Sequence, residues 1–189
     1  MWLLTRTPPP RVIIDPMGSA RTDVPGVYST ADPTGRTWPS DATTVRFVPV
    51  DHDDLDSYNR IYREIRRRIF DRQWPGASIL ADEGERIMPA NNTPKDAASC
   101  VYAGRKWPTC HITASTRPRN IYTGVFANIT NAALYPLPRR EDRDTVAANL
   151  GIPLAQLEEL WRALPNEWSF LWWTQASREI RPVHAAPPT

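Results

Sequence analysis

Short apolar segments alternate along this chain with segments of helical periodicity, and this alternation restricts the folds that it can adopt. Six segments are expected to form strands: Arg11–Pro16, Thr43–Pro49, Ala77–Asp82, Thr109–Ser115, Ala132–Leu137 and Trp168–Thr174. Between the second and the third, Asp51–Arg72 carries its apolar residues on one stripe at helical spacing. Strands that are apolar on both faces and alternate with helices are typical of a mainly parallel sheet covered by helices. We therefore expect an α/β fold with a mainly parallel sheet flanked by helices.

Further helices and loops complete this plan. Helices are expected at Thr93–Ala103, Ile121–Ile129, Glu141–Leu150 and Pro153–Leu164, and the Gly-, Pro- and Ser-rich segment Gly18–Ser40 is expected to be a long surface loop. A chain of 189 residues is suited to one domain with a sizeable core. We place that domain over residues 1–180, followed by a flexible proline-rich tail over residues 181–189.

Composition excludes several classes of protein. The net charge of +2 points to no particular partner. No apolar run approaches the roughly 18 to 20 residues that a membrane span needs, and the start of the chain does not resemble a secretory signal, so we expect a cytoplasmic protein without a membrane span. Cys100 and Cys110 form no disulfide framework, and the histidines stand at no metal-binding distance from them in the sequence.

Arginines gather in two segments. The first group is Arg60, Arg63, Arg66, Arg67, Arg68 and Arg72, and the second is Arg117, Arg119, Arg139, Arg140 and Arg143. Such groups suit nucleic acid or phosphate. They equally suit solvated helix faces and loops in which arginines pair with acids. The sequence leaves both interpretations open.

Two neighbouring acids follow the expected strand Ala77–Asp82. Asp82 ends the strand, where it could bind Mg²⁺ directly or through water, and Glu83 is the next residue, where it could polarise an attacking water. Ligand sites of open α/β sheets form at the carboxyl ends of the strands. The pair is therefore the strongest candidate for a nucleotide-hydrolysing site.

The order of the neighbouring motifs resembles the FtsK/HerA-type P-loop ATPases, which include DNA-translocating members from phages and viruses. In that family a strand ending in Asp-Glu is followed by a Gly-Arg-[Lys/His] segment and then by a strand ending Ala-[Ser/Thr]-Gln-Arg-Pro. Here the corresponding segments are Gly104–Lys106 and Ile112–Pro118, and an upstream strand ends in the similar sequence Asp15–Gly18. The likeness covers most of residues 11–174 and implies a RecA-like P-loop NTPase core.

The resemblance also implies roles for particular residues. Asp82 would be the Mg²⁺-side acid and Glu83 the catalytic base, while Ser115 and Thr116 stand where the family senses the γ-phosphate. The family usually has Gln at the position of Thr116, and a threonine hydroxyl has a shorter reach. Arg105 would face the nucleotide of a neighbouring subunit and stabilise charge on the transferring phosphoryl group; it equally suits a cation at the end of a helix.

One part of the family pattern is absent from the sequence. The phosphate-binding pattern G-x-x-x-x-G-K-[ST] occurs nowhere in the 189 residues. The resemblance therefore implies a core that lacks its N-terminal strand, loop and helix, as a truncated motor, as one part of a split ATPase, or as a decayed subunit. ATP and Mg²⁺ are the implied cofactors, although the isolated chain is expected to hydrolyse ATP barely or not at all. The implied setting is a bacterial or phage-infected cell.

The expected function is ATP-dependent DNA translocation or packaging. Double-stranded DNA and either further copies of the chain or a complementing ATPase subunit are the expected partners. Two alternatives remain: a non-catalytic assembly or DNA-binding subunit that retains the fold, and a DNA-binding regulator that uses a helix-turn-helix at Asp144–Leu164. In the second helix of that pair Gln156, Glu158 and Glu159 point outward, and acids there would repel phosphate, which favours simple packing. Trp168, Trp172 and Trp173 are expected to be packing anchors rather than base-stacking residues.

Overall fold

The structure is a computed structural model, and it describes residues 9–18, 26–39, 42–102 and 108–184. These residues form two compact units. The first is drawn from residues up to Thr116 together with Asn120–Gly124, and the second from Arg117–Arg119 together with Val125 and the residues after it. The single domain over residues 1–180 stays a prediction, because two compact units can belong to one domain or to two.

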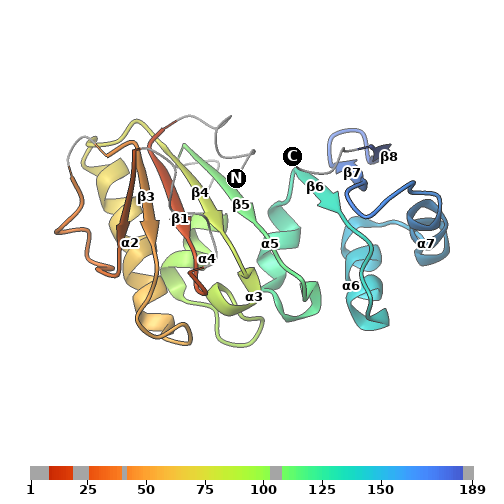
Figure 1. Ribbon diagram of the computed structural model, residues 1–189, viewed down its shortest axis with the longest axis horizontal. Coiled ribbons are helices and arrows are strands. Elements are labelled where there is room, and N and C mark those ends of the chain that lie inside the picture. Colours follow the sequence, from red (N-terminus) through yellow and green to blue (C-terminus); the bar gives the residue numbers. More distant parts are fainter. Residues whose placement is uncertain (1–8, 19–25, 40–41, 103–107, 185–189) are drawn as a thin grey trace. The chain divides into compact units, whose positions relative to one another are not determined.

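A five-stranded sheet forms the centre of the first unit (Figure 1). Its strands are β1 (Arg11–Ile14), β2 (Val27–Thr30), β3 (Thr44–Phe47), β4 (Ala77–Ala81) and β5 (Thr109–Thr113), in the order β2-β3-β1-β4-β5. Every neighbouring pair is parallel, so the carboxyl ends of all the strands lie along one edge. The expected fold class, a mainly parallel sheet flanked by helices, is confirmed.

The central strands supply much of the core of this unit. Val12, Ile14 and Ile79 have no exposed surface, and Phe47 on β3 is equally buried. A parallel sheet covered on both faces needs strands without polar alternation, and these β-branched runs meet that need. Burial of each such side chain contributes roughly 1.5–3 kcal/mol relative to exposure.

The long helix α2 (Leu55–Phe70) covers part of the sheet, within the range expected from periodicity. Asp54 caps it, because its side chain accepts hydrogen bonds from the backbone N–H groups of Asp56 and Ser57. Tyr58 and Tyr62 are fully buried and reach opposite parts of the sheet: the ring of Tyr58 meets Phe47 on β3, and that of Tyr62 stacks on His111 on β5. The helix therefore fixes the sheet across most of its width.

Four shorter helices follow in the chain. They are α3 (Gly84–Ile87), α4 (Lys95–Tyr102), the 3₁₀ turn η1 (Pro118–Asn120) and α5 (Thr123–Asn128). Asp96 of α4 joins that helix to α2: it accepts hydrogen bonds from Arg63, at 3.0 Å, and from Arg66, and its backbone N–H donates to the side chain of Asn59. These contacts hold α4 against α2 and neutralise two arginines of the first basic group.

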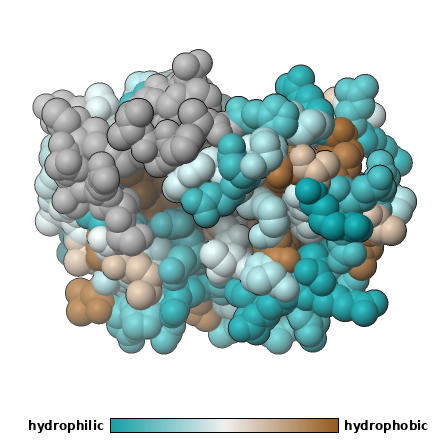
Figure 2. All heavy atoms as spheres, turned by 45° about the vertical axis from the view of Figure 1, so that its right-hand side comes forward, coloured by the Kyte–Doolittle hydropathy of each residue, from teal (hydrophilic) through white to brown (hydrophobic). Residues whose placement is uncertain are grey.

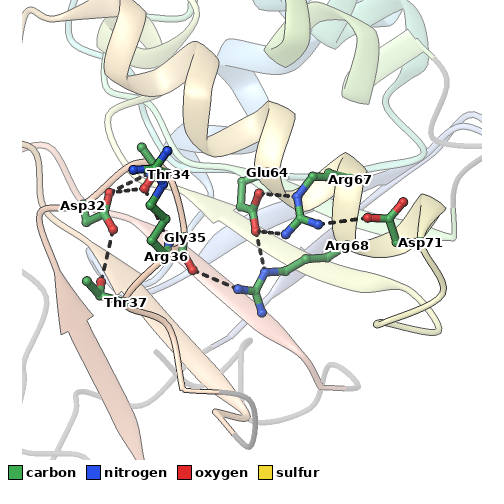
Figure 3. A network of polar contacts seen from close by, with 9 residues as sticks. All are labelled: Asp32, Thr34, Gly35, Arg36, Thr37, Glu64, Arg67, Arg68 and Asp71. Carbon is green, nitrogen blue, oxygen red and sulfur yellow. Dashed lines mark hydrogen bonds and ion pairs between the residues drawn. The ribbon is translucent and has the colours of Figure 1, made fainter.

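The segment Gly18–Ser40 was expected to be a surface loop, and this is wrong in part. It contains β2, which pairs with β3, and Trp38, which is only 6% exposed. Trp38 stacks on Trp74 with ring centroids 5.9 Å apart, and the guanidinium of Arg68 lies 4.9 Å from the Trp38 ring centre. Arg68 also donates to the backbone carbonyl of Gly35 at 3.0 Å (Figure 3). Packing between Trp38, Trp74 and Arg68, which are far apart in the sequence, holds the described residues around Trp38 in place, and local composition carries no sign of these contacts.

The second unit is built around a separate antiparallel sheet. Its strands are β6 (Asn131–Leu134), β7 (Phe170–Thr174) and β8 (Glu179–Val183), in the order β6-β7-β8, and its helices are α6 (Arg140–Leu150) and α7 (Leu154–Arg162). A hydrophobic cluster joins the helices to one face of the sheet, with Leu157 and Leu171 fully buried. Gly151 adopts φ +68° at the end of α6 and allows the chain to turn directly into α7.

The expected strands Ala132–Leu137 and Trp168–Thr174 were predicted to join the parallel sheet. This is wrong, because they form β6 and β7 of the separate antiparallel sheet. In β7 the residues alternate, with Leu171 and Trp173 buried and Phe170, Trp172 and Thr174 half-buried. Alternation of this kind is typical of an antiparallel strand with one covered face, but a run of aromatic residues hides it in the sequence. β8 also includes the first residues of the expected tail, and residues 185–189 lie outside those that the structure describes.

Among the residues that the structure describes, no helix is both long enough and apolar enough to cross a bilayer. Figure 2 shows hydrophobic residues as several separate groups among hydrophilic ones on the face that it draws.

Candidate functional site

The candidate site lies at the carboxyl edge of the parallel sheet, directly after β4. The backbone N–H of Asp82 donates to the carbonyl of Ile14 at the end of β1, at 3.0 Å, and the Asp82 side chain accepts from the N–H of Glu83 at 3.1 Å. Ala81 pairs in register with Ile14 on one side and with Thr113 on the other. The acid pair therefore follows the tip of β4 between the tips of β1 and β5, as the strand pattern predicts.

A tight turn carries the chain from the strand into α3. Glu83 has φ 50° and ψ 57°, a left-handed conformation that is uncommon for any residue with a side chain. Gly84 then donates its N–H to the carbonyl of Ala114 at 2.7 Å. A Cβ atom at Gly84 would lie 2.2 Å from the Thr113 side chain, so only glycine permits this close approach. The sequence Asp-Glu-Gly thus encodes the turn that fastens the acids to the neighbouring strand.

Glu83 is engaged by a cation of its own helix. Its Oε2 atom lies 2.7 Å from Nε of Arg86, and Arg86 also donates from Nη1 to Asp53 at 3.1 Å. The side chains of Glu83 and Arg86 are each 37% exposed, so the pair borders solvent. The Oε2 atom is itself buried, and its contact with Arg86 has the geometry of an ion pair without good hydrogen-bond alignment.

A buried ion pair supports the same edge. Asp15 follows β1 with no exposed surface, and Arg46 of β3 binds its Oδ2 through Nε at 2.9 Å and through Nη2 at 2.6 Å. Gly18, which follows with φ +66°, donates its N–H to the Asp15 carbonyl at 3.3 Å. Sequence reasoning missed Arg46, Arg86 and Asp53. The arginine inside the otherwise apolar run Thr43–Pro49 was the one signal that could have drawn attention to Arg46.

Ser115 and Thr116 follow the tip of β5, the strand next to β4. Ser115 is half-buried, and the Thr116 hydroxyl donates to Oε1 of Glu85, in α3, at 3.1 Å. The backbone N–H of Ala114 donates to the carbonyl of Ala81 at 2.9 Å, so these residues begin beside the acid pair. The structure thus brings the expected phosphate-sensing segment to the same edge. Arg105 lies outside the residues that the structure describes.

The acid pair is chemically suited to Mg²⁺ as a cofactor. No cluster of three or more His, Cys, Asp or Glu side chains among the described residues could hold a metal ion by itself. Magnesium usually needs only one or two carboxylates and completes its shell with water and substrate phosphates. Asp82, half-buried at the strand tip, fits that arrangement, and its role as the metal-side acid stays a prediction.

Most of the arginines in the two basic groups are paired with acids. Arg67 and Arg68 both bind Glu64, and Arg63 and Arg66 bind Asp96. In the second unit Arg117 binds Asp142 at 3.0 Å, and Arg143 binds Glu158 at 3.1 Å. These pairs favour the interpretation of the basic groups as structural.

The contacts between α6 and α7 likewise indicate a structural role for this helix pair. Val146 and Leu150 of α6 meet Leu157 and Trp161 of α7 in the core of the second unit. The Arg143–Glu158 ion pair joins the two helices, and the adjacent Glu159 is exposed. An acid on the outer face of the second helix disfavours its use as a reader of DNA.

Comparisons with known proteins show the fold. The sequence matches no protein-family model and no curated protein. Solved structures of the genome packaging NTPase B204 from Sulfolobus turreted icosahedral virus 2 are similar to the chain in three dimensions. In the complex of that protein with AMPPCP the TM-score is 0.76 at 12% identity, over 99% of this chain and 87% of that one. In its complex with sulfate the TM-score is 0.75 at 13% identity, over 100% and 86%.

A third structure of the same viral protein, in complex with ATP-gammaS, has a TM-score of 0.69 at 12% identity, over 91% of this chain and 80% of that one. At such low identity the likeness concerns the fold and not the activity. The chain therefore shares the fold of this viral protein, in agreement with the expected mainly parallel sheet flanked by helices.

Proposed function

We propose that this chain is a subunit, or part of one, of an ATP-dependent motor that translocates or packages DNA. The observation that carries the proposal is the position of Asp82 and Glu83 after the tip of a central parallel strand, next to the strand that leads into Ser115. The fold of the chain is similar to that of a viral genome packaging NTPase, which has been solved with ATP analogues, and this supports nucleotide binding by the chain.

We assign a chemical role to each residue of the site from its position at the edge of the sheet. Asp82 would hold Mg²⁺, which supplies charge neutralisation for the phosphates when bound. Glu83 would accept a proton from the attacking water after leaving Arg86, and the hydroxyls of Ser115 and Thr116 would donate to phosphate oxygens. Arg105 would act toward a neighbouring subunit. The backbone amides that normally hold the phosphates would come from another segment or polypeptide, because the sequence contains no phosphate-loop pattern.

Steady-state ATP hydrolysis tests the proposal in two parts. The chain alone is expected to turn over ATP barely or not at all. A mixture with a polypeptide that carries a phosphate loop, chosen from the neighbouring genes, is expected to hydrolyse ATP, and Glu83→Gln should abolish that activity. Asp144→Asn, at an exposed acid of α6 that makes only a 3.8 Å ion pair with Arg140, is the matched control and should have no effect.

Two results would contradict the proposal. Robust turnover by the chain alone, lost in Glu83→Gln, would show that the phosphates are held without the missing loop. Turnover in the mixture that Glu83→Gln leaves unchanged would show that the acids have another role.

A non-catalytic subunit that retains the fold is the second candidate. The observation that favours it is the engagement of Glu83 by Arg86, which in turn binds Asp53. A gene neighbourhood without any phosphate loop, together with assembly that is unchanged in Asp82→Asn and Glu83→Gln variants, would support this candidate over the motor.

A further inference from the structure

One face of the antiparallel sheet lies outside the hydrophobic core of the second unit. Every residue of β6, β7 and β8 that belongs to the hydrophobic cluster of this unit lies on the same face, including Leu171 and Trp173. The opposite face carries Phe170, Trp172 and Thr174 of β7, because successive residues of a strand point to opposite sides. We call this opposite face, with Tyr135 just beyond β6, the aromatic face.

Three aromatic rings meet on the aromatic face. The ring of Tyr135 lies 5.2 Å from that of Phe170, tilted by 39°, and the ring of Phe170 lies 6.5 Å from that of Trp172. Tyr135 is 48% exposed, and Phe170 and Trp172 are half-buried. Opposite Trp172 stands Ala133, whose methyl group covers little of an indole ring. The rings therefore offer connected π surface to solvent.

Positive charge accompanies the rings. Arg181 of β8 pairs in register with Trp172, so its side chain stands on the same face, and it is exposed. Arg178 lies at the exposed turn between β7 and β8, at the end of the sheet where Thr174 pairs with Glu179. Among the described residues of β6, β7 and β8, the one acid on this face is Glu179, which pairs in register with Thr174 at the end of the strand away from Tyr135. Arg181 is thus the cation of this face that stands beside the rings.

This chemistry favours one kind of occupant. Unpaired bases stack on aromatic side chains whatever their sequence, and arginines beside the rings meet the phosphates of the same strand. A duplex offers no free base faces for stacking. An apolar protein partner would bury Arg181 without an anion, which is costly, and the cores of protein interfaces are depleted in charged residues.

We propose that the aromatic face binds single-stranded nucleic acid, with bases stacked on Tyr135, Phe170 and Trp172 and a phosphate held by Arg181. The proposal does not depend on ATP hydrolysis and concerns residues that the proposed motor site does not use. It also revises the expectation that the tryptophans serve only as packing anchors: Trp173 does so, while Trp172 is turned to the other face.

The test is equilibrium binding of a fluorescently labelled oligo(dT) strand to the full chain, with a duplex of the same length as the competing ligand. The variants Tyr135→Leu and Trp172→Leu keep apolar bulk but remove the π surface, and each is expected to weaken binding by roughly tenfold. Arg181→Gln should weaken binding and lower the slope of log K against log salt by about one. Circular dichroism establishes that each variant is folded.

A matched control lies in the same unit. Arg162→Gln removes an exposed arginine of α7 and should not change the affinity. Binding that the leucine variants leave intact would overturn the proposal. Equal affinity for the duplex would also overturn it. A self-association of the chain that the leucine variants retain and that excludes the strand would identify a second copy as the occupant instead.

Discussion

The Nε atom of Arg86 lies 2.7 Å from Oε2 of Glu83, so the acid expected to be the catalytic base is paired with a cation three residues later. The left-handed backbone of Glu83 and the start of α3 create this pairing. A base that is held by a cation is not free to accept a proton from water. In the proposed mechanism Glu83 must therefore leave Arg86 before it can act as the base.

Release should cost little. Both side chains are partly exposed, and pairs of this kind contribute roughly 0–1 kcal/mol. Arg86→Gln is expected to lower the free energy of unfolding by less than about 1 kcal/mol, measured by urea denaturation. A loss several times larger would show that the pair is a structural element and that Glu83 is not available for chemistry.

A substitution in the buried ion pair between Asp15 and Arg46 should reduce stability much more. Arg46 and Asp15 are almost without exposed surface, and removing one partner of such a pair leaves a buried charge unmatched. Arg46→Met is therefore expected to cost about 3–5 kcal/mol of stability. Arg36→Met, at an exposed arginine, is the control and should change stability by no more than about 0.5 kcal/mol. Equal effects of the two changes would refute the structural role given to Arg46.

The turn after the acids makes a steric prediction. Gly84→Ala would place a Cβ atom 2.2 Å from the Thr113 side chain and 3.2 Å from the Ala114 carbonyl oxygen, so β5 or α3 must shift. We expect a loss of about 1–3 kcal/mol in the free energy of unfolding. At Gly151, a Cβ atom would meet nothing within 4 Å, and Gly151→Asn, which suits its left-handed conformation, should be nearly neutral. If Gly84→Ala were neutral, the close approach of Gly84 to Thr113 and Ala114 would not be required for stability.

Much of the candidate site can be predicted from the sequence, because the motifs that contain Asp82, Glu83 and Ser115 are local. The acids are adjacent in the chain, and the apolar run before them predicts a strand and hence a shared edge with the strand leading to Ser115. The contacts that complete the site cannot be read in this way. Arg86 with Asp53, and Arg46 with Asp15, are pairs of residues more than thirty positions apart in the sequence.

The second sheet was missed for a related reason. In β7 the aromatic run Phe170–Trp173 is uniformly large and apolar, and periodicity alone cannot show that its residues alternate between a core and an open face. The strand β2 was missed because the packing of Trp38 on Trp74, and not the composition of its own segment, holds the region in place.

His111 makes the stability depend on pH. Its Nε2 lies 2.8 Å from the Tyr62 hydroxyl and its Nδ1 lies 3.1 Å from that of Thr113, and burial lowers its pKa from 6.5 to about 4. Between these values the unfolded chain binds the proton and the folded chain does not. Stability contributed by neutral His111 is thus fully present above pH 6.5 and is lost as the pH falls toward 4.

The upper limit of this effect is about 3–4 kcal/mol, from 1.36 kcal/mol for each unit by which the pKa of His111 is lowered. Urea denaturation at a series of pH values measures it. His111→Gln retains hydrogen-bonding groups but does not titrate, so its stability should fall less steeply than that of the unaltered chain over this range. Parallel pH profiles for the two proteins would show that His111 does not carry the dependence.

Nuclear magnetic resonance of the labelled chain during addition of Mg²⁺ and a non-hydrolysable ATP analogue tests the central claim most directly, because it detects weak binding without turnover. The account predicts that amide signals of residues 82–84 and 114–116 shift together with a common dissociation constant, that Asp82→Asn removes these shifts, and that Asp144→Asn preserves them. Shifts that survive in Asp82→Asn, or that fall elsewhere in the chain and leave the carboxyl edge of the parallel sheet unaffected, would contradict it.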